Sequence, residues 1–216
     1  MKLHAVGGLC NRLRAILSWA RPVTVIWEPD EYVSFARFED VFRPLSGVEF
    51  RYRVETWDVE AWAPMPGAGA GWEERYRELV TVDDYRSPLP GSYVAIHVRR
   101  TDQVPDLERH GLRPRTLNHY AAWAHQWQTL PVHVATDNGE TQAQLLSLLG
   151  SRGIVGRRLE GRALQELHDH RRNGTLHDAV RDLVRCADAL HFLGSPHSSF
   201  TDTINVLRRF RGLEAG

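Results

Sequence analysis

Short apolar runs alternate with helix-like segments along this chain, and this alternation constrains its fold more than any other feature. Residues 3–6, 23–27 and 93–96 have the continuous apolar character of buried strands. The segments between such runs, for example residues 117–127, carry apolar side chains at helical spacing, with Thr116 as the expected N-cap. Because strands that alternate with helices form parallel sheets through right-handed crossovers, the sequence predicts an α/β fold.

The remaining elements follow the same pattern and group into two halves. A Pro- and Gly-rich stretch over residues 63–91 marks the seam, so we expect an amino-terminal half over residues 1–90 and a carboxy-terminal half over residues 91–216. A polar segment over residues 160–175 is predicted to be a loop with some helix. Further strands are expected over residues 48–57, 131–137 and 189–193 and near Ile154, and further helices over residues 11–20, up to Leu149, over residues 177–186 and from near Ser199.

Composition excludes several classes of partner. The 216 residues carry a formal net charge of zero, which argues against general binding to nucleic acid or anionic membranes. The positive charge is almost all arginine, since Lys2 is the only lysine. Cys10 and Cys186 are too few for a disulfide framework and are wrongly spaced for zinc. With no apolar run of membrane-spanning length and no signal-peptide core at the start, we expect a reduced, cytoplasmic protein.

The strongest functional signal follows the third apolar run, in residues 97–102 (His-Val-Arg-Arg-Thr-Asp). Open α/β sheets bind ligands at the carboxyl ends of their strands, where this segment delivers an imidazole, two guanidinium groups and a carboxylate. Paired guanidinium groups are planar, permanently charged donors that fit a diphosphate. The alternative is an ion-pair network within the loop. The clustering favours a phosphate-ester site built from His97, Arg99, Arg100 and Asp102.

Polar residues also follow two other predicted strands. Asp137 ends the strand over residues 131–137, where it is either a ligand contact or a turn residue or helix cap. Ser198 and Ser199 precede the last predicted helix, whose N-terminus favours anions. Simple N-capping by these serines is the alternative. Three polar strand ends are therefore expected to converge at one edge of the sheet.

Four segments together resemble the signature segments of the α1,6- and protein O-fucosyltransferase superfamily. They are residues 7–14 (Gly-Gly-Leu-Cys-Asn-Arg-Leu-Arg), 97–102, 135–138 (Ala-Thr-Asp-Asn) and 198–200 (Ser-Ser-Phe). Within this superfamily the chain is most similar to the bacterial nodulation-factor α1,6-fucosyltransferases, and the resemblance spans nearly its whole length. The chain is much shorter than those enzymes, chiefly in the first half, where the acceptor usually docks.

The resemblance implies a GT-B fold, with two Rossmann-like halves and a shortened amino-terminal half. It further implies metal-independent, inverting transfer of fucose from the donor GDP-fucose to a hydroxyl-bearing acceptor such as a glycan. By the same resemblance, Arg99 would clamp the donor diphosphate, Arg100 would support the site or reach the acceptor, and His97 would lie near the nucleoside or the β-phosphate. The residues themselves agree, because fixed guanidinium donors can stabilise the negative charge that develops on the departing nucleoside diphosphate.

The guanine-binding residues come from the resemblance alone. Asp178 lies closest to the place of the family's base-reading aspartate, and Asp182 is the alternative. Ser198, Ser199 and Phe200 would contact phosphate and base.

An inverting transfer needs a base for the acceptor hydroxyl. Asp106 and Glu108 fall in the loop after the arginine pair, where some members of the family place a carboxylate, and His97 is a rival. Either carboxylate could equally be a solvated loop charge. Asn11 and Arg12 follow the first glycine pair and are candidates for contact with donor or acceptor.

No metal or bound cofactor is expected. Asp83 and Asp84 are adjacent, unlike the spaced pair of an Asp-x-Asp motif. Ten of the eleven histidines lie between His97 and His197, but their spacing matches no zinc site. Aromatic residues that either stack on a sugar acceptor or pack within the fold are Trp57, Trp62 and Trp72.

Two other functions remain open. One is an enzyme of the same fold that moves another sugar, such as xylose, rhamnose or mannose, from its own nucleotide donor. The other is a non-catalytic nucleotide-binding relative that keeps the arginine clamp. An enzyme that uses another sugar would differ from a fucosyltransferase in the nucleotide that it binds selectively. A non-catalytic relative would bind a nucleotide but would neither transfer the sugar nor hydrolyse the donor.

Overall fold

The chain divides into two compact units. The first comprises Met1–Asp84 with Thr175–His177, and the second comprises Tyr85–Gly174 with Asp178–Gly216. The computed structural model describes all residues except 54–55, 69–70, 86–88, 90, 101–106, 110 and 160–173. The predicted loop over residues 160–175 thus lies almost entirely outside the described part.

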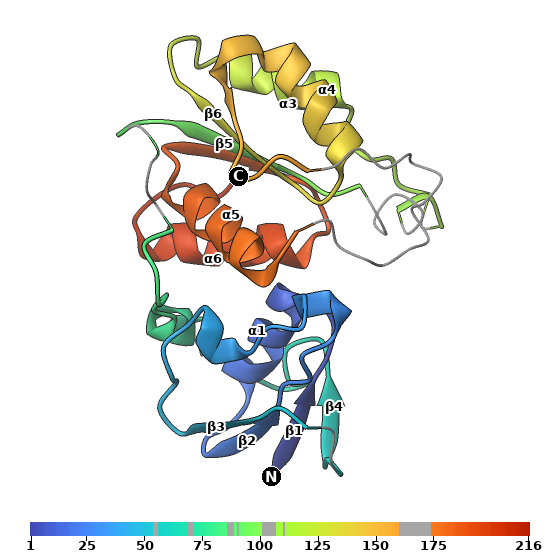
Figure 1. Cartoon of the computed structure of the whole chain (residues 1–216), viewed down its shortest axis with the longest axis vertical. Helices are drawn as coiled ribbons and strands as arrows, with labels where there is room; N and C mark the ends of the chain where they lie inside the picture. The colour runs from blue at the N-terminus through green and yellow to red at the C-terminus, as the bar shows by residue number, and fades with distance from the viewer. Residues whose placement is uncertain are drawn as a thin grey trace. The chain divides into compact units, whose positions relative to one another are not determined.

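The first unit contains a four-stranded parallel sheet. Its strands are β1 (Lys2–Ala5), β2 (Val23–Ile26), β3 (Val48–Arg51) and β4 (Val59–Ala61), in the order β3-β2-β1-β4. Helix α1 (Leu9–Ser18) lies over one face of this sheet (Figure 1). It buries Leu9, Leu13 and Ile16, whose spacing of four and three residues forms one apolar stripe.

Helix and strand boundaries differ in places from the prediction. The strand predicted over residues 48–57 ends at Arg51, and β4 was not predicted. β4 has only three residues, with a charged residue in the centre, so the sequence shows no strand periodicity there. It is a strand because it pairs with β1, Val59 with Leu3 and Ala61 with Ala5. α1 begins two residues earlier than expected, and the strand predicted from residue 189 begins at residue 191.

An aromatic cluster fills the space beside β2 and β3. Trp27 meets the ring of Phe38 edge-on at 5.6 Å, and Phe38 stacks on Phe50 at 4.2 Å. Trp27 directly follows β2, Phe38 begins the 3₁₀ helix η2 (Phe38–Asp40) and Phe50 lies in β3; another 3₁₀ helix, η1 (Glu31–Val33), lies between Trp27 and Phe38 in the sequence. A third, η3 (Trp72–Glu78), contributes the buried Tyr76 and packs against α1.

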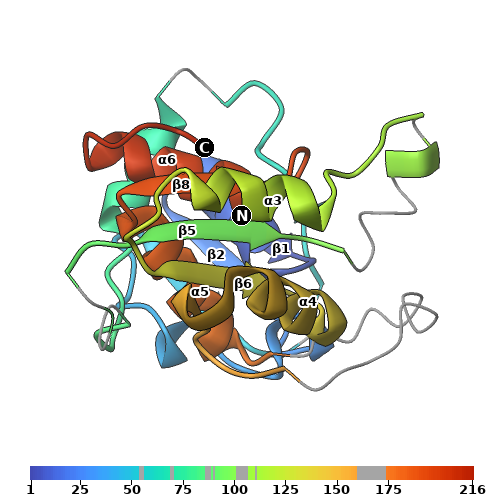
Figure 2. The same ribbon diagram turned by 90° about the horizontal axis from the view of Figure 1, so that it is seen from above.

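The second unit is a three-layer α/β sandwich. Its parallel strands are β5 (Val94–Val98), β6 (Val132–Thr136), β7 (Gly153–Ile154) and β8 (His191–Gly194), in the order β7-β6-β5-β8. Helices α3 (Leu117–His125) and α4 (Gly139–Leu149) lie on one face, and α5 (Leu176–Asp188) and α6 (Ser199–Phe210) lie on the other (Figures 1 and 2). A 3₁₀ turn, η4 (Gly150–Arg152), precedes β7.

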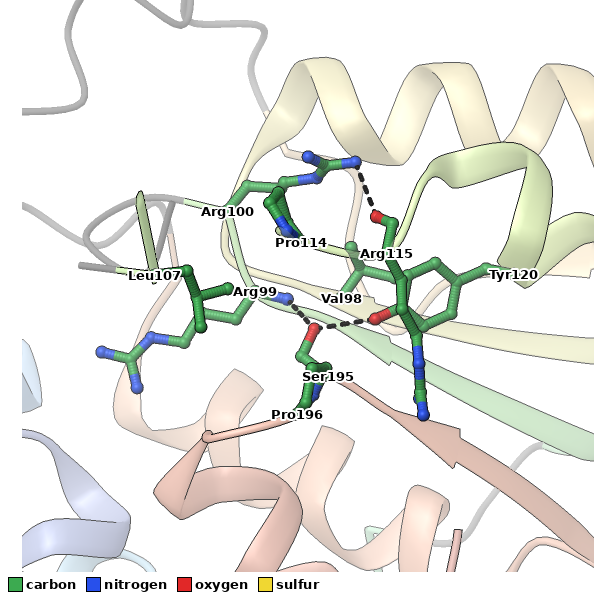
Figure 3. A pocket seen from close by; sticks show the side chains of 9 residues that line it. All are labelled: Val98, Arg99, Arg100, Leu107, Pro114, Arg115, Tyr120, Ser195 and Pro196. Atoms are coloured by element: carbon green, nitrogen blue, oxygen red, sulfur yellow. Dashed lines mark hydrogen bonds between the residues drawn. The ribbon is translucent and has the colours of Figure 1, made fainter. Parts of the chain in front are cut away.

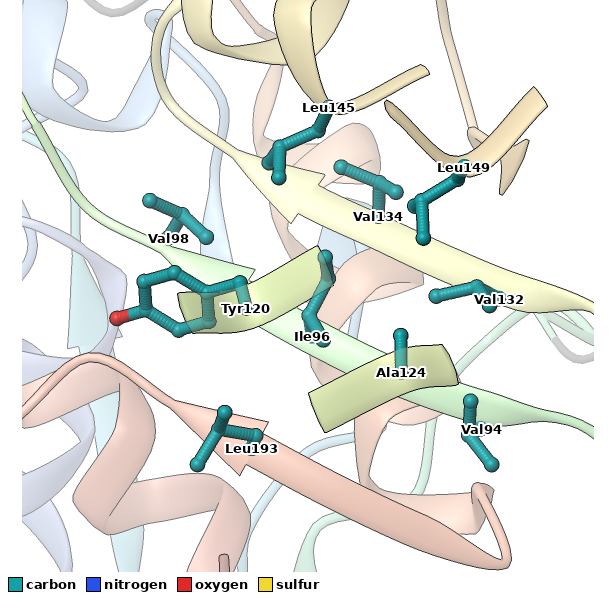
Figure 4. Packing of buried hydrophobic residues seen from close by; sticks show 10 residues of the cluster. All are labelled: Val94, Ile96, Val98, Tyr120, Ala124, Val132, Val134, Leu145, Leu149 and Leu193. Carbon is teal, nitrogen blue, oxygen red and sulfur yellow. The ribbon is translucent and has the colours of Figure 1, made fainter. Parts of the chain in front are cut away.

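The core under α3 and α4 explains the apolar runs of the sequence. Every residue of β5 is buried, as expected for a central strand covered on both faces. Val94, Ile96 and Val98 point to this side, where they pack against Tyr120 and Ala124 of α3 (Figure 4). The same cluster is completed by Val132, Val134, Leu145, Leu149 and Leu193.

Side-chain caps begin the helices of this face. The hydroxyl of Thr116 accepts from the N–H of His119 at 3.2 Å, which confirms the predicted N-cap of α3. Asn138 caps α4 in the same way, accepting from the N–H of Thr141 at 2.8 Å. The cap of α4 is therefore Asn138 and not its neighbour Asp137.

Both sheets have the strand order third-second-first-fourth, which is the order of the first four strands of a Rossmann fold. The sequence prediction of α/β, Rossmann-like units is therefore confirmed at this level. No helix in the described ranges is both long and apolar enough to span a membrane.

Candidate functional site

A pocket lies at the carboxyl edge of the second sheet, where β5 and β8 meet. From β5 the chain first adds β6 and β7 on one side of the strand and then returns to add β8 on the other side. Open α/β sheets bind ligands at such a switch point, which here lies between β5 and β8. The pocket is entirely within the second unit (Figure 3). Its lining residues are Val98, Arg99, Arg100, Leu107, Pro114, Arg115, Tyr120, Ser195 and Pro196.

Ser195 joins the two strand ends beneath the pocket. Its hydroxyl accepts from the main-chain N–H of Arg99 at 2.9 Å and donates to the carbonyl of His97 at 3.3 Å. The phenol of Tyr120 lies 3.1 Å from the same oxygen, and because the serine proton is already given to His97, the phenol donates. Burial raises the pKa of Tyr120, so this phenol keeps its proton at neutral pH.

Arg100 is anchored by contacts with two neighbours. Its main-chain N–H donates to the carboxylate of Asp137 at 3.1 Å, and its Nη2 donates to the carbonyl of Arg115 at 3.3 Å. From the end of β6, Asp137 thus holds the main chain at Arg100 in place. Arg115 in turn donates from Nη1 to the carbonyl of Gly194, at the end of β8, at 2.8 Å.

The guanidinium groups of Arg99, Arg100 and Arg115 point in different directions around the pocket (Figure 3). Consecutive residues of an extended chain project to opposite sides, so Arg99 and Arg100 do not form a pair on one ligand position. In Figure 3 the Arg99 side chain leads away from Ser195 and Tyr120, whereas the Arg100 side chain reaches the carbonyl of Arg115. The expected pair is therefore one candidate clamp and one supporting residue.

His97 links β5 to the start of α6. Its Nδ1 lies 2.9 Å from the hydroxyl of Thr201, and its ring lies 4.8 Å from that of Phe200. Gly194 allows this approach, because a Cβ there would come within 2.6 Å of the Thr201 hydroxyl. The imidazole is buried, so these contacts fix its position next to the N-terminus of α6.

Ser198 is the N-cap residue of α6, yet its side chain makes no capping hydrogen bond. The residue is completely buried, and its Oγ has no hydrogen-bond partner among the residues that the structure describes. A buried hydroxyl without a partner carries a cost of about 1–3 kcal/mol. Simple N-capping therefore does not explain Ser198. Ser199 is half-buried and forms the first residue of the helix.

Arg115 and Tyr120 belong to the site but were not singled out from the sequence. Their positions in the sequence could have identified them. Arg115 immediately precedes Thr116, the N-cap of α3, and Tyr120 lies one turn into this helix, which is the first long helix after β5. Both are therefore brought back to the carboxyl edge of β5 by the crossover itself.

The carboxylates proposed to read guanine are both paired with other groups. Asp178 contacts Arg181 at 2.6 Å and Arg157 at 3.0 Å. Asp182 contacts Nε2 of the buried His133 at 3.0 Å. Both aspartates lie on α5, so reading a base with either would require exchange of an existing contact.

Two candidate residues, Asp102 and Asp106, lie outside the described residues. Glu108 is described and its side chain is exposed, on a short helical turn after the arginine loop. The neighbouring Leu107 is buried against the pocket.

The two candidates of the first unit take different positions. Asn11 packs against Gly7, where the φ of +81° favours glycine and an added Cβ would lie only 3.1 Å from the Asn11 amide nitrogen. Arg12 is fully buried, and its guanidinium donates to the carbonyls of Gly7 and Glu28 and to the carboxylate of Asp30. These contacts join the loops after β1 and β2, so Arg12 acts within the fold.

Among the described residues, no group of three or more His, Cys, Asp or Glu side chains is arranged to hold a metal ion. The three tryptophans considered from the sequence have separate surroundings. Trp62 is exposed, Trp57 lies against the ring of His4 at 4.5 Å, and Trp72 contacts Tyr76 at 5.9 Å.

In the comparisons with known proteins, no family model matches the chain and no curated protein matches it. Arguments about function therefore rest on the geometry of the site and on the motifs of the sequence.

Proposed function

We propose that this protein is a glycosyltransferase that binds a nucleoside-diphosphate sugar at the carboxyl edge of its second sheet. The observation that carries this proposal is the pocket between the ends of β5 and β8, which three arginines line at the switch point of a Rossmann-like sheet. Arginine is the residue best suited to a diphosphate, because its planar group donates two parallel hydrogen bonds. The resemblance of residues 97–102 to fucosyltransferases suggests GDP-fucose as the donor.

The chemistry that such a site can perform is an inverting displacement. The acceptor oxygen forms a bond to C1 of the sugar as the bond between C1 and the β-phosphate oxygen breaks, and the acceptor proton passes to a base. Negative charge then grows on the departing nucleoside diphosphate, where Arg99 and the N-terminus of α6 can stabilise it. In this proposal the arginines supply the positive charge, so the reaction needs no metal ion.

The base is proposed from the same loop. Asp106 and Glu108 remain the carboxylate candidates, since His97 already contacts Thr201 and Phe200. The acceptor side is assigned to the first unit, as in a GT-B enzyme with a shortened amino-terminal half. A glycan hydroxyl is the proposed acceptor.

The first test is a thermal-shift panel of GDP, UDP, CDP, ADP and dTDP, with and without Mg²⁺, confirmed by calorimetry. A ligand at one hundred times its Kd stabilises the folded state by about 2.7 kcal/mol. For a chain of this size that free energy raises Tm by about 5–10 °C. Selective stabilisation by GDP without metal is the expected result.

The other results of the panel contradict specific parts of the proposal. A preference for UDP or dTDP would keep the site but assign another donor sugar. No response to any nucleotide would remove the nucleotide site. If GDP binds, release of GDP and fucose from GDP-fucose by slow hydrolysis then separates an enzyme from a non-catalytic relative.

Ser198→Ala tests the α6 end of the site. Because the Ser198 hydroxyl is buried without a partner, its removal is expected to leave the Tm of the free protein unchanged or higher. The affinity for GDP is expected to fall about tenfold, since one hydrogen bond to a charged group is worth about 1.5 kcal/mol or more. Isothermal calorimetry and thermal unfolding measure the two effects.

Ser147→Ala, at an exposed position of α4 outside the site, is the control and is expected to leave both the Tm and the affinity for GDP unchanged. A lower Tm in Ser198→Ala with unchanged GDP affinity would show that the hydroxyl serves the fold and not the ligand.

A further inference from the structure

Ser195 uses the whole hydrogen-bonding capacity of its side chain within the second unit. A serine hydroxyl has one proton to donate and two lone pairs with which to accept. At Ser195 the proton goes to the carbonyl of His97, while the lone pairs accept from the N–H of Arg99 and from the phenol of Tyr120. The residue is only 3% exposed. Ser195 therefore holds its neighbours in place and has no donor left for a ligand.

This hydroxyl continues the contact between β5 and β8 beyond the ends of the two strands. The pairing of β5 with β8 ends at His97 and Gly194, and Ser195 is the next residue after Gly194. Its side chain then accepts the N–H of Arg99, one residue past the end of β5. A side chain thus replaces the main chain as the acceptor where the strand has ended.

The same arrangement occurs on the other side of β5. The pairing of β5 with β6 ends at Thr136, and the next residue, Asp137, accepts the N–H of Arg100. Because β5 lies between β6 and β8, the N–H groups of Arg99 and Arg100 are held from opposite sides. The main chain is therefore fixed at the point where the Arg99 side chain begins.

The phenol of Tyr120 adds a contact from α3. Its ring is 1% exposed and packs in the same cluster as Val98, with its oxygen near Ser195 (Figures 3 and 4). Burial raises the pKa of the phenol, so it remains a donor at neutral pH. Because the phenol occupies one lone pair of Ser195, the serine proton is directed to His97 and the other lone pair to Arg99.

We propose that Tyr120 is a positioning residue of the nucleotide site. Through Ser195, its phenol fixes the main chain at Arg99 and thereby the direction from which the guanidinium meets the diphosphate. The guanidinium lies at the end of a long side chain, so a small rotation of the main chain at its base moves the donors out of hydrogen-bonding range. This inference rests on the proposed function, because it assigns a role within the same site.

Direct contact between the phenol and a ligand is the alternative, because Tyr120 lines the pocket. The chemistry of the phenol opposes this alternative. Its single proton is donated to Ser195, so only lone pairs of the phenol oxygen remain, and these repel the oxygens of a diphosphate. The two roles predict different results when both Tyr120 and Ser195 are replaced.

Calorimetry with GDP on two single variants and their double variant tests the proposal. Tyr120→Phe removes the hydroxyl and keeps the buried ring, and its affinity for GDP is expected to fall about fivefold, the effect of one hydrogen bond. Ser195→Ala removes the acceptor of the Arg99 N–H, and its affinity is expected to fall about tenfold. The double variant is expected to bind GDP like Ser195→Ala, because residues that act through one another have non-additive effects.

Hydrogen exchange measures the positioning itself in the free protein. The amide of Arg99 is expected to exchange about fivefold faster in Tyr120→Phe and in Ser195→Ala than in the wild type, because its acceptor is displaced or missing. This measurement needs no nucleotide. If the wild type binds no nucleotide, the proposed function fails and this inference fails with it. If the wild type binds GDP and exchange at Arg99 is the same in all variants, this inference alone fails.

Tyr93→Phe is the matched control. Tyr93 is another buried tyrosine of the second unit, at the amino end of β5, and its phenol donates to the carbonyl of Arg185 at 2.8 Å. This variant is expected to lower Tm about as much as Tyr120→Phe does. Its affinity for GDP and its exchange rate at Arg99 are expected to equal those of the wild type.

Three further results would contradict the positioning role while leaving the nucleotide site in place. One is equal affinity of Tyr120→Phe and wild type for GDP. Another is a further fivefold loss when Tyr120→Phe is added to Ser195→Ala, which would indicate direct contact between the phenol and the nucleotide. The third is an equal loss of affinity in Tyr93→Phe, which would indicate a general effect of lower stability.

Discussion

Arg99→Ala is expected to lower the affinity for GDP by about 100-fold or more, which corresponds to about 2.7 kcal/mol. Arg99 lines the pocket, and in the proposed function its guanidinium binds the diphosphate. The fold is expected to survive, because the link from Arg99 to Ser195 uses the main-chain N–H, which alanine retains. Calorimetry with GDP and the Tm of the free protein measure the two effects.

Arg99→Lys and Arg113→Ala complete this experiment. Lysine keeps the charge but loses the two-pronged donor, so GDP binding is expected to be intermediate. Arg113 is exposed in the segment that leads to α3, and its replacement removes one positive charge near the site. A GDP affinity for Arg99→Ala within threefold of that of Arg113→Ala would reject Arg99 as the clamp.

The sequence predicted the strand ends of the second unit well, because buried parallel strands are continuous apolar runs. Residues 93–96 and 131–137 stand out for this reason, and the polar residues directly after them had to lie at one edge of a parallel sheet. That reasoning predicted that His97, Arg99 and Asp137 lie at the same edge, where Arg99 contacts Ser195 and Asp137 contacts Arg100.

Side-chain direction could not be predicted in the same way. Adjacent arginines suggested a joint clamp, yet Arg100 is tied to Asp137 and to the carbonyl of Arg115. The contacts that decide this come from strands and helices distant in the sequence. Short elements are hard to predict from the sequence for a related reason: β4 is a strand only because it pairs with β1.

The abundance of arginine also has a structural meaning that composition did not reveal. Three arginines donate to main-chain carbonyls at the ends of helices, where the last four carbonyls lack partners. They therefore serve the fold and not an anion. The acceptors are the carbonyls of Leu17 and Trp19 for Arg75, of Ala124 and Trp127 for Arg152, and of Cys186 and Ala189 for Arg208.

Arg12 is the clearest example of an arginine that stabilises the fold. Arg12→Met is expected to destabilise the protein by about 3–5 kcal/mol. Methionine keeps much of the apolar stem but leaves the partly buried carbonyls of Gly7 and Glu28, and the carboxylate of Asp30, without this donor. The guanidinium also lies over the ring of Trp27 at 5.0 Å, and this contact is lost as well. A free-energy change of this size lowers Tm by about 10 °C in a chain of this length.

Hydrogen exchange and GDP binding of Arg12→Met together distinguish a structural role of Arg12 from a role in ligand binding. Hydrogen exchange is expected to accelerate in the loops after β1 and β2, which Arg12 joins through Gly7 and Glu28, and GDP affinity of the remaining folded protein is expected to be unchanged. Arg14→Met, on the same helix at a half-buried position, is the matched control, with a smaller loss of Tm. If Arg12→Met were as stable as Arg14→Met but bound GDP more weakly, the guanidinium would act on the donor after all, because its contacts within the fold would then be dispensable.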